Sequence, residues 1–149
     1  MTNNNKKAQL IIPVEMREKV NLFTYGTLMS GRGNNILLKG QELIGKGILR
    51  GYECYALPYG FPAITEGNGE VVGEVWRIDK SLLPKVDMLE SYKENDIANS
   101  MYIRNVEVVD MDTDDVACYV YVWNWALPPD AEQVKSGTVW TNHSTLRFK

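Results

Sequence analysis

The hydrophobic pattern predicts strands over most of this chain and helices over little of it. The first strand is predicted at residues 20–25, where strand-forming residues run up to a turn that begins at Gly26. Gly26 is expected to supply backbone freedom there, and a short helix is expected to start at residues 34–38. A strand that ends in such a turn leaves backbone N–H groups without partners, which suits a carboxylate or an oxyanion. A turn with nothing bound fits this stretch equally well.

Glycines interrupt the strand that is predicted next, at residues 43–57. They stand at positions 45, 47 and 51, and several glycines within one strand favour bends and bulges in a strongly curved sheet. The sequence Glu-Gly-Asn-Gly at 66–69 is typical of a hairpin turn between strands at 63–65 and 71–78. Two further strands are predicted at 101–110 and 116–125, joined by an acidic turn.

One carboxylate lies on the apolar face of the helix predicted at residues 79–90. At about 100° per residue, Glu90 falls within the arc formed by Leu82, Leu83, Val86 and Leu89. A carboxylate in apolar surroundings is costly to ionise, so its pKa should rise toward neutrality, where it can exchange protons. The simpler and more common alternative is that Glu90 ends a frayed helix and turns to solvent. Asp87, at the edge of the arc, is a second acid or, as we favour, a solvated helix residue.

Composition limits the possible classes of protein. With 149 residues and 44% hydrophobic content, the chain suits one globular domain at residues 20–149, preceded by a flexible arm at 1–19. A net charge of −3 with no basic cluster argues against nucleic acid as a partner. No apolar run is long enough for a membrane helix, so a cytoplasmic location is expected. Cys54 and Cys118 lie in apolar segments and are expected to be buried free thiols.

Several common chemistries do not fit the residues present. His143 is the only histidine, so a Ser-His-Asp catalytic triad or a histidine-bearing metal site is not expected. The glycines at 45–51 fail as a dinucleotide fingerprint because Arg50 takes the third glycine position. The acidic turn fails as a calcium loop because Asp115 stands where glycine is required. What remains is carboxylate, tyrosine and backbone N–H chemistry, with no metal and no cofactor.

Five short motifs in a fixed order resemble the gamma-glutamylcyclotransferase-like family, which includes the bacterial YtfP branch, AIG2-like proteins and gamma-glutamylamine cyclotransferases. The motifs are Tyr-Gly-Thr-Leu at 25–28, and the segments 67–79, 86–92, 102–104 and 119–121. The resemblance covers roughly residues 21–140. It implies an α+β fold built on a small, mostly antiparallel, strongly curved β-barrel with a few short helices and a cavity at one end.

The resemblance also implies a reaction. A gamma-glutamyl amine or peptide would be converted to 5-oxoproline and a free amine, with Glu90 as general base and acid. The glutamyl group would be held through the backbone of Tyr25, Gly26, Thr27 and Leu28, and the cavity walls would include Tyr92, Tyr102 and Tyr121. The alternative is a barrel of the same fold that binds a small metabolite without turnover. The identity of the amine and the oligomeric state stay open.

Overall fold

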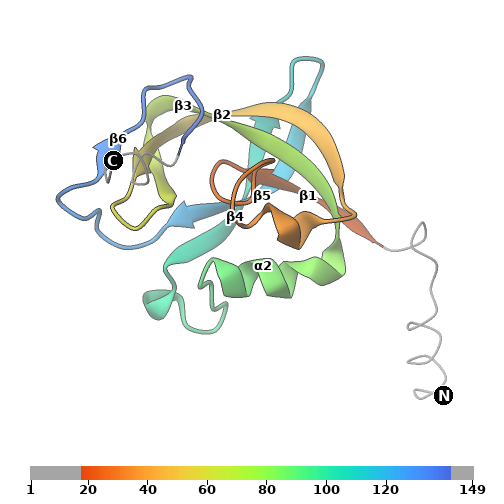
Figure 1. Cartoon of the computed structure of the whole chain (residues 1–149), viewed down its shortest axis with the longest axis horizontal. Coiled ribbons are helices and arrows are strands. Elements are labelled where there is room, and N and C mark those ends of the chain that lie inside the picture. Colours follow the sequence, from red (N-terminus) through yellow and green to blue (C-terminus); the bar gives the residue numbers. More distant parts are fainter. Residues whose placement is uncertain (1–17, 142–149) are drawn as a thin grey trace.

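The computed structural model describes residues 18–141, and these form a closed β-barrel with a few short helices (Figure 1). Five strands make the ring in the order β3, β1, β5, β4, β2, and the ring closes because β2 also pairs with β3. A short sixth strand extends the edge of β2. The strands are β1 (Lys19–Thr24), β2 (Glu42–Ala56), β3 (Pro62–Asp79), β4 (Tyr102–Asp110), β5 (Asp115–Trp123) and β6 (Glu132–Gln133). The predicted α+β class and curved, mostly antiparallel barrel are confirmed.

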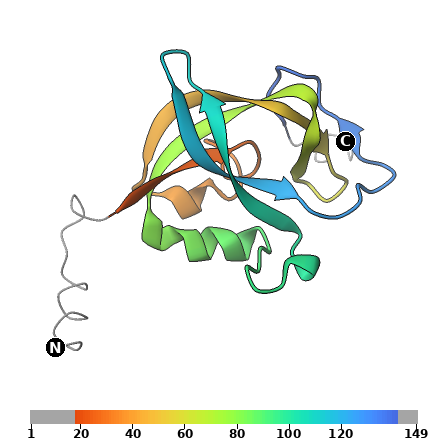
Figure 2. The ribbon, with the colours of Figure 1, turned by 180° about the vertical axis from the view of Figure 1, so that it is seen from behind.

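Strands β2 and β3 form a long two-stranded ribbon that arches over the molecule (Figures 1 and 2). The hairpin turn predicted at residues 66–69 is wrong, because β3 runs without a break through this stretch. The turn that joins the two strands lies at 57–61, where the Leu57 N–H donates to the Phe61 carbonyl. Gly67 and Gly69 serve close packing instead: a Cβ on Gly69 would lie 3.0 Å from the Tyr52 carbonyl oxygen.

Strand β1 separates two hydrophobic cores. Successive side chains of a strand point to opposite faces, and here Leu22 joins one buried cluster while Phe23 joins the other. The second half of the strand is buried on both faces, which explains why its sequence is an apolar run and not an alternation. The pocket described below therefore begins at the buried end of this strand.

The helices are short and lie mainly on one side of the barrel, opposite the β2–β3 ribbon (Figures 1 and 2). They are the 3-10 helices η2 (Asn35–Leu38), η3 (Lys80–Leu82) and η4 (Ile97–Asn99) and the α-helix α2 (Leu83–Leu89). The apolar arc predicted around residues 79–90 is half right: Leu83 and Val86 are buried, whereas Leu89 is 37% exposed. Helix α2 ends at Leu89, and Glu90 is its C-cap.

Other predictions can be compared with the described residues. Cys54 and Cys118 are both buried and free, as expected. The acidic segment after β4 is a hairpin turn, in which the Met111 N–H donates to the Asp114 carbonyl. Strand β1 begins at Lys19, at the end of the predicted arm, and residues 1–17 of that arm lie outside the described residues, as does His143. None of the helices within residues 18–141 has the length and apolar character needed to cross a membrane.

Candidate active site

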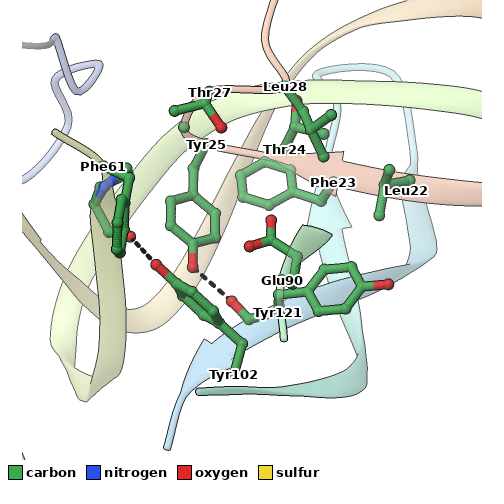
Figure 3. Close-up of a pocket in the computed structure, with 12 residues that line it drawn as sticks. Leu22, Phe23, Thr24, Tyr25, Thr27, Leu28, Phe61, Glu90, Tyr102 and Tyr121 are labelled. Carbon is green, nitrogen blue, oxygen red and sulfur yellow. Dashed lines mark hydrogen bonds between the residues drawn. The ribbon is translucent and has the colours of Figure 1, made fainter. Parts of the chain in front are cut away.

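A pocket opens where β1 ends and the following loop begins (Figure 3). Seven of the eight residues that the sequence predicted for the site line this pocket: Tyr25, Gly26, Thr27, Leu28, Glu90, Tyr102 and Tyr121. The eighth, Tyr92, is not among the lining residues, and its ring packs edge-on against Tyr121 with the centroids 6.5 Å apart. The structure thus brings together a loop, the end of α2 and two barrel strands.

The loop after β1 is braced by its own hydrogen bonds. Met29 N–H donates to the Gly26 carbonyl at 3.1 Å. Asn34 reaches back to Thr27 twice, with its backbone N–H to the carbonyl at 2.9 Å and its side-chain amide to the hydroxyl at 2.8 Å. The N–H groups of Gly26, Thr27 and Leu28 donate to no other described residue. These three donors belong to residues that line the pocket and are therefore available to an anionic group.

Gly26 is required for space and not for backbone freedom. Its φ lies outside the left-handed region, which corrects the expectation drawn from the sequence. A Cβ at this position would stand 2.8 Å from both Cδ and Cγ of Pro62. Pro62 is the first residue of β3 and also lines the pocket. The loop can approach β3 this closely only because residue 26 has no side chain.

Glu90 supplies the only carboxylate among the described residues that line the pocket. Figure 3 shows its side chain pointing into the pocket, toward the segment that carries Phe23, Thr24 and Tyr25. Burial raises the pKa of this carboxyl from 4.5 to about 7. The cause is desolvation, because an ionised carboxylate in apolar surroundings loses its hydration without gaining a cationic partner. Near neutral pH this group can both accept and donate a proton.

Three tyrosines form a hydrogen-bonded wall beside Glu90. Tyr25 Oη donates to the main-chain oxygen of Tyr121 at 2.5 Å, and Tyr102 Oη donates to the main-chain oxygen of Pro62 at 2.5 Å (Figure 3). Burial raises the pKa of all three phenols well above their ordinary value. The phenols are therefore neutral at physiological pH, and their protons are committed to the barrel backbone and to Asp87.

Asp87 is not the solvated residue that the sequence suggested. It accepts hydrogen bonds from Arg104 Nη1 at 2.8 and 2.7 Å and from Tyr121 Oη at 2.5 Å. The Arg104 guanidinium also lies over the rings of Tyr92 and Tyr119, 5.4 and 5.0 Å from their centroids. This network lies behind the pocket wall and ties helix α2 to strands β4 and β5.

Five lining residues were not predicted: Leu22, Phe23, Thr24, Phe61 and Pro62. The first three precede the Tyr-Gly-Thr-Leu motif on β1, and they look like ordinary strand residues because both faces of β1 are buried. Phe61 and Pro62 could have been predicted from the sequence. They belong to the segment 58–62, which contains two prolines and two aromatic residues. Among the described residues, no group of acidic, histidine or cysteine side chains is arranged to hold a metal ion.

The structure is a small barrel with a pocket lined by one carboxylate and by the loop at residues 25–28, and comparison with known families identifies its class. The family model described as "Gamma-glutamyl cyclotransferase, AIG2-like" matches residues 22–142. The chain belongs to this family. All seven lining residues predicted from the sequence fall within the matched segment.

Individual relatives support the same assignment. The YtfP protein of Escherichia coli is 36% identical over 70 residues, a match that spans 47% of this chain and 61% of that protein's length. PH0828 of Pyrococcus horikoshii is 28% identical and covers 80% of this chain and 90% of its own length. The crystal structure of a mouse AIG2-like protein superposes with a TM-score of 0.62 at 24% identity, covering 81% of this chain and 89% of that one, which shows a shared fold.

Proposed function

We propose that this protein is a gamma-glutamyl cyclotransferase, which converts a gamma-glutamyl amine or peptide into 5-oxoproline and a free amine. In this reaction the α-amine of the glutamyl group attacks its own γ-carbonyl carbon. A new C–N bond closes the five-membered lactam, and the bond to the departing amine breaks. No water is consumed and no electrons are transferred. The reaction therefore needs one group that moves a proton and donors that hold the substrate folded.

The observation that carries this proposal is the position of Glu90 in a pocket shared with the unpaired N–H groups of residues 26–28. A substrate ammonium in the pocket would favour the ionised form of Glu90, because an opposite charge lowers the pKa of a buried carboxyl. The carboxylate would then accept one proton from the α-ammonium, freeing the nucleophile. The attacking nitrogen gives up a second proton as the lactam forms, and Glu90 would pass both protons in turn to the departing nitrogen, which leaves as an ammonium.

The loop and the tyrosines complete the proposed mechanism. N–H groups of Gly26, Thr27 and Leu28 would bind the substrate α-carboxylate or the oxygen that becomes negative during attack. Tyr25 and Tyr102 would act as neutral walls, since their hydroxyl protons are held by backbone carbonyls. Water is displaced from a pocket of this kind when substrate fills it, which strengthens each of these polar interactions.

The direct test is a mass-spectrometric screen for 5-oxoproline over a panel of gamma-glutamyl amines and peptides. Wild-type protein should release 5-oxoproline from at least one of them, and Glu90→Gln should lower kcat by roughly 100-fold or more, as expected for loss of a general acid–base. Glu94→Gln is the matched control, since Glu94 is an exposed residue of the following loop. Full activity in Glu90→Gln would remove Glu90 from the mechanism.

The same panel separates cyclisation from its alternatives. Hydrolysis would release glutamate, whereas cyclisation releases 5-oxoproline. A barrel that only binds metabolites would bind a gamma-glutamyl compound, measured by calorimetry, and return it unchanged. Either result would overturn the cyclotransferase proposal while leaving the family membership intact.

A further inference from the structure

A second, apolar groove lies beside the pocket and is not used by the proposed proton transfer. Its principal lining side chains are Tyr59, Phe61, Met101, Trp123, Trp125 and Pro128. None of the described residues that line it carries a charge. Two of the rings face solvent, since Tyr59 is 59% exposed and Trp125 is 47% exposed. An exposed cluster of large aromatic side chains generally marks a binding surface.

The groove adjoins the pocket. Phe61 lines both of them, and Tyr102 of the pocket packs edge-on against Trp123 of the groove at 5.2 Å between centroids. The ring contacts continue outward on each side, with Tyr59 5.7 Å from Phe61 and Trp125 6.0 Å from Trp123. In Figure 3, Phe61 and Leu22 lie at opposite ends of the lining residues, with Glu90 between them. The groove therefore lies on the Phe61 side of the pocket.

We propose that this groove binds the amine half of the substrate and selects gamma-glutamyl amides whose amine carries an uncharged aromatic group. The proposal rests on the cyclotransferase function proposed above, in which a glutamyl group fills the pocket. The amine half of the substrate must then extend out of the pocket, and the groove that shares Phe61 with the pocket offers it an apolar, aromatic surface. Aromatic rings bury large apolar area and stack favourably against other aromatic rings.

The polar edges of the two tryptophans are already satisfied within the protein. Trp123 Nε1 donates to the Ala126 carbonyl at 3.3 Å, and Trp125 Nε1 donates to the Ala98 carbonyl at 3.2 Å. The indoles therefore offer their apolar surfaces to a ligand and not their N–H groups. A cationic amine would meet π-faces without any carboxylate in the groove, and an anionic one would find no cation, so an uncharged ring is the best match.

The test uses two substrates that differ by one ring: the gamma-glutamyl derivatives of phenethylamine and of ethylamine. Wild-type protein should show a kcat/KM about tenfold or more higher for the phenethylamide. Trp125→Ala and Tyr59→Ala should each lower kcat/KM for the phenethylamide several-fold more than for the ethylamide, chiefly through KM. Ile36→Ala, which removes an exposed apolar side chain outside the groove, is the control and should leave the ratio unchanged.

A third substrate, the mono-gamma-glutamyl derivative of 1,4-diaminobutane, tests the cationic alternative. The inference is overturned if the phenethylamide is no better than the ethylamide, if the diaminobutane derivative is preferred, or if the groove variants affect all substrates equally. It is also overturned if Trp125→Ala changes the oligomeric mass in sedimentation and not the substrate ratio, since the groove would then be a contact between copies of this chain.

A binding measurement separates failure of this inference from failure of the cyclotransferase proposal. Calorimetry with wild-type protein and Glu90→Gln compares binding of the phenethylamide with that of the ethylamide. If no substrate yields 5-oxoproline, the proposed function fails. Tighter binding of the phenethylamide that is lost in Trp125→Ala then still supports an aromatic subsite, and equal binding overturns it. Turnover of both amides at equal kcat/KM overturns the proposed role of the groove and leaves the cyclotransferase proposal standing.

Discussion

Glu90 is a carboxyl group whose burial, and not a neighbouring charge, determines its titration. Desolvation raises its pKa from 4.5 to about 7. An acid whose pKa is lowered in the folded state by a salt bridge makes the protein more stable as pH rises. An acid whose pKa is raised in the folded state makes the protein less stable as pH rises. Below about pH 4.5 the group is neutral in both the folded and the unfolded chain, and its burial does not lower the free energy of unfolding through ionisation. As pH rises from 4.5 to 7, Glu90 ionises in the unfolded chain before it ionises in the folded chain, so the free energy of unfolding falls.

This linkage predicts how Glu90→Gln changes stability with pH. The pKa difference between 4.5 and about 7 corresponds to roughly 3 kcal/mol at most, reached above pH 7. The free energy of unfolding of the variant, relative to wild type, should therefore grow by up to that amount from pH 4.5 to 8. Urea unfolding at several pH values measures the difference, with Glu94→Gln as the control for loss of an acidic side chain. A difference that shrinks as pH rises would show that Glu90 is stabilised as an anion.

The same group sets a pH profile for catalysis. In the proposed mechanism Glu90 accepts a proton as the carboxylate, so kcat/KM should rise with pH and level off above an apparent pKa of about 7. The plot of log(kcat/KM) against pH, measured for wild type at constant ionic strength, reports that value because it reflects the free enzyme. An acidic limb near pH 4.5 would mean that the carboxyl is solvated in solution.

Gly26 gives a test of the loop. An added methyl group would lie 2.8 Å from Pro62 and would push the loop or the start of β3 outward. Gly26→Ala should raise KM and lower kcat/KM by about tenfold or more, because small displacements of a positioning segment are costly to catalysis. Gly33→Ala is a matched control in the same loop, since a Cβ there meets nothing within 4 Å. Equal kinetics for the two variants would contradict the close approach.

At the scale of single residues, the sequence predicted those features that depend on local periodicity. The helical arc identified Glu90 because the apolar residues of the arc precede it within about two turns of the same helix. It favoured a solvated Asp87 and was wrong there, because the partners Arg104 and Tyr121 lie 17 and 34 positions further along the chain. Gly26 was identified correctly but for the wrong reason, because the obstacle is Pro62, 36 positions away, and not the local φ.

At the scale of elements, an ion pair between Arg104 and Asp87 adds to the packing of Leu83 and Val86 in joining helix α2 to the barrel. The Arg104 and Asp87 side chains are only 19% and 22% exposed, and Asp87 lies three residues before Glu90. This pair should therefore determine where the end of α2, and with it the Glu90 carboxylate, lies relative to the pocket. Its energetic weight is expected to exceed that of a surface pair, because the charges are partly shielded from water.

Arg104→Leu should accordingly lower the free energy of unfolding by roughly 1–3 kcal/mol and reduce kcat. A double-mutant cycle with Asp87→Asn, followed by urea unfolding, should give a coupling energy of about 1 kcal/mol or more. Arg50→Leu is the comparison, because Arg50 also pairs with acidic residues but its side chain is 55% exposed, and its loss should cost less than about 1 kcal/mol. Similar losses for both arginines would contradict the shielding argument.

Helices, strands and turns were predicted well where the residues of one segment determine its structure. They were predicted poorly where the same residue type, such as glycine, serves two different structural purposes. The acidic turn between β4 and β5 and the long glycine-interrupted strand β2 follow their patterns. The glycines at 67 and 69 suggested a turn, yet β3 continues through them because they make room for Glu53 and the Tyr52 backbone on the neighbouring strand. A glycine required for space and a glycine required for φ are identical in sequence.

For the whole molecule, the closed barrel could be predicted only through its family resemblance. Two of the contacts that close the ring are minimal in backbone pairing: β1 meets β5 in parallel at Leu22 and Tyr119, and β2 meets β4 at Ile48 and Asp110. No local pattern specifies such long-range pairs. The curvature that brings these strands together was visible, however, in the glycines of β2.

The barrel also needs a close approach between the neighbouring strands β1 and β3, which gives a last prediction. A Cβ on Gly73 would lie 2.2 Å from the Thr24 carbonyl oxygen and 2.8 Å from Phe23, so backbone and a buried ring would both have to move. Gly73→Ala should cost roughly 3 kcal/mol or prevent folding. Gly67→Ala, in the same strand, meets only side-chain atoms of Glu53, which can rotate away, and should cost about 1 kcal/mol. Thermal and urea unfolding of both variants measure the contrast. If the two alanines are tolerated equally, β1 and β3 do not approach as closely in solution, and the pocket at the end of β1 is wider than this structure shows.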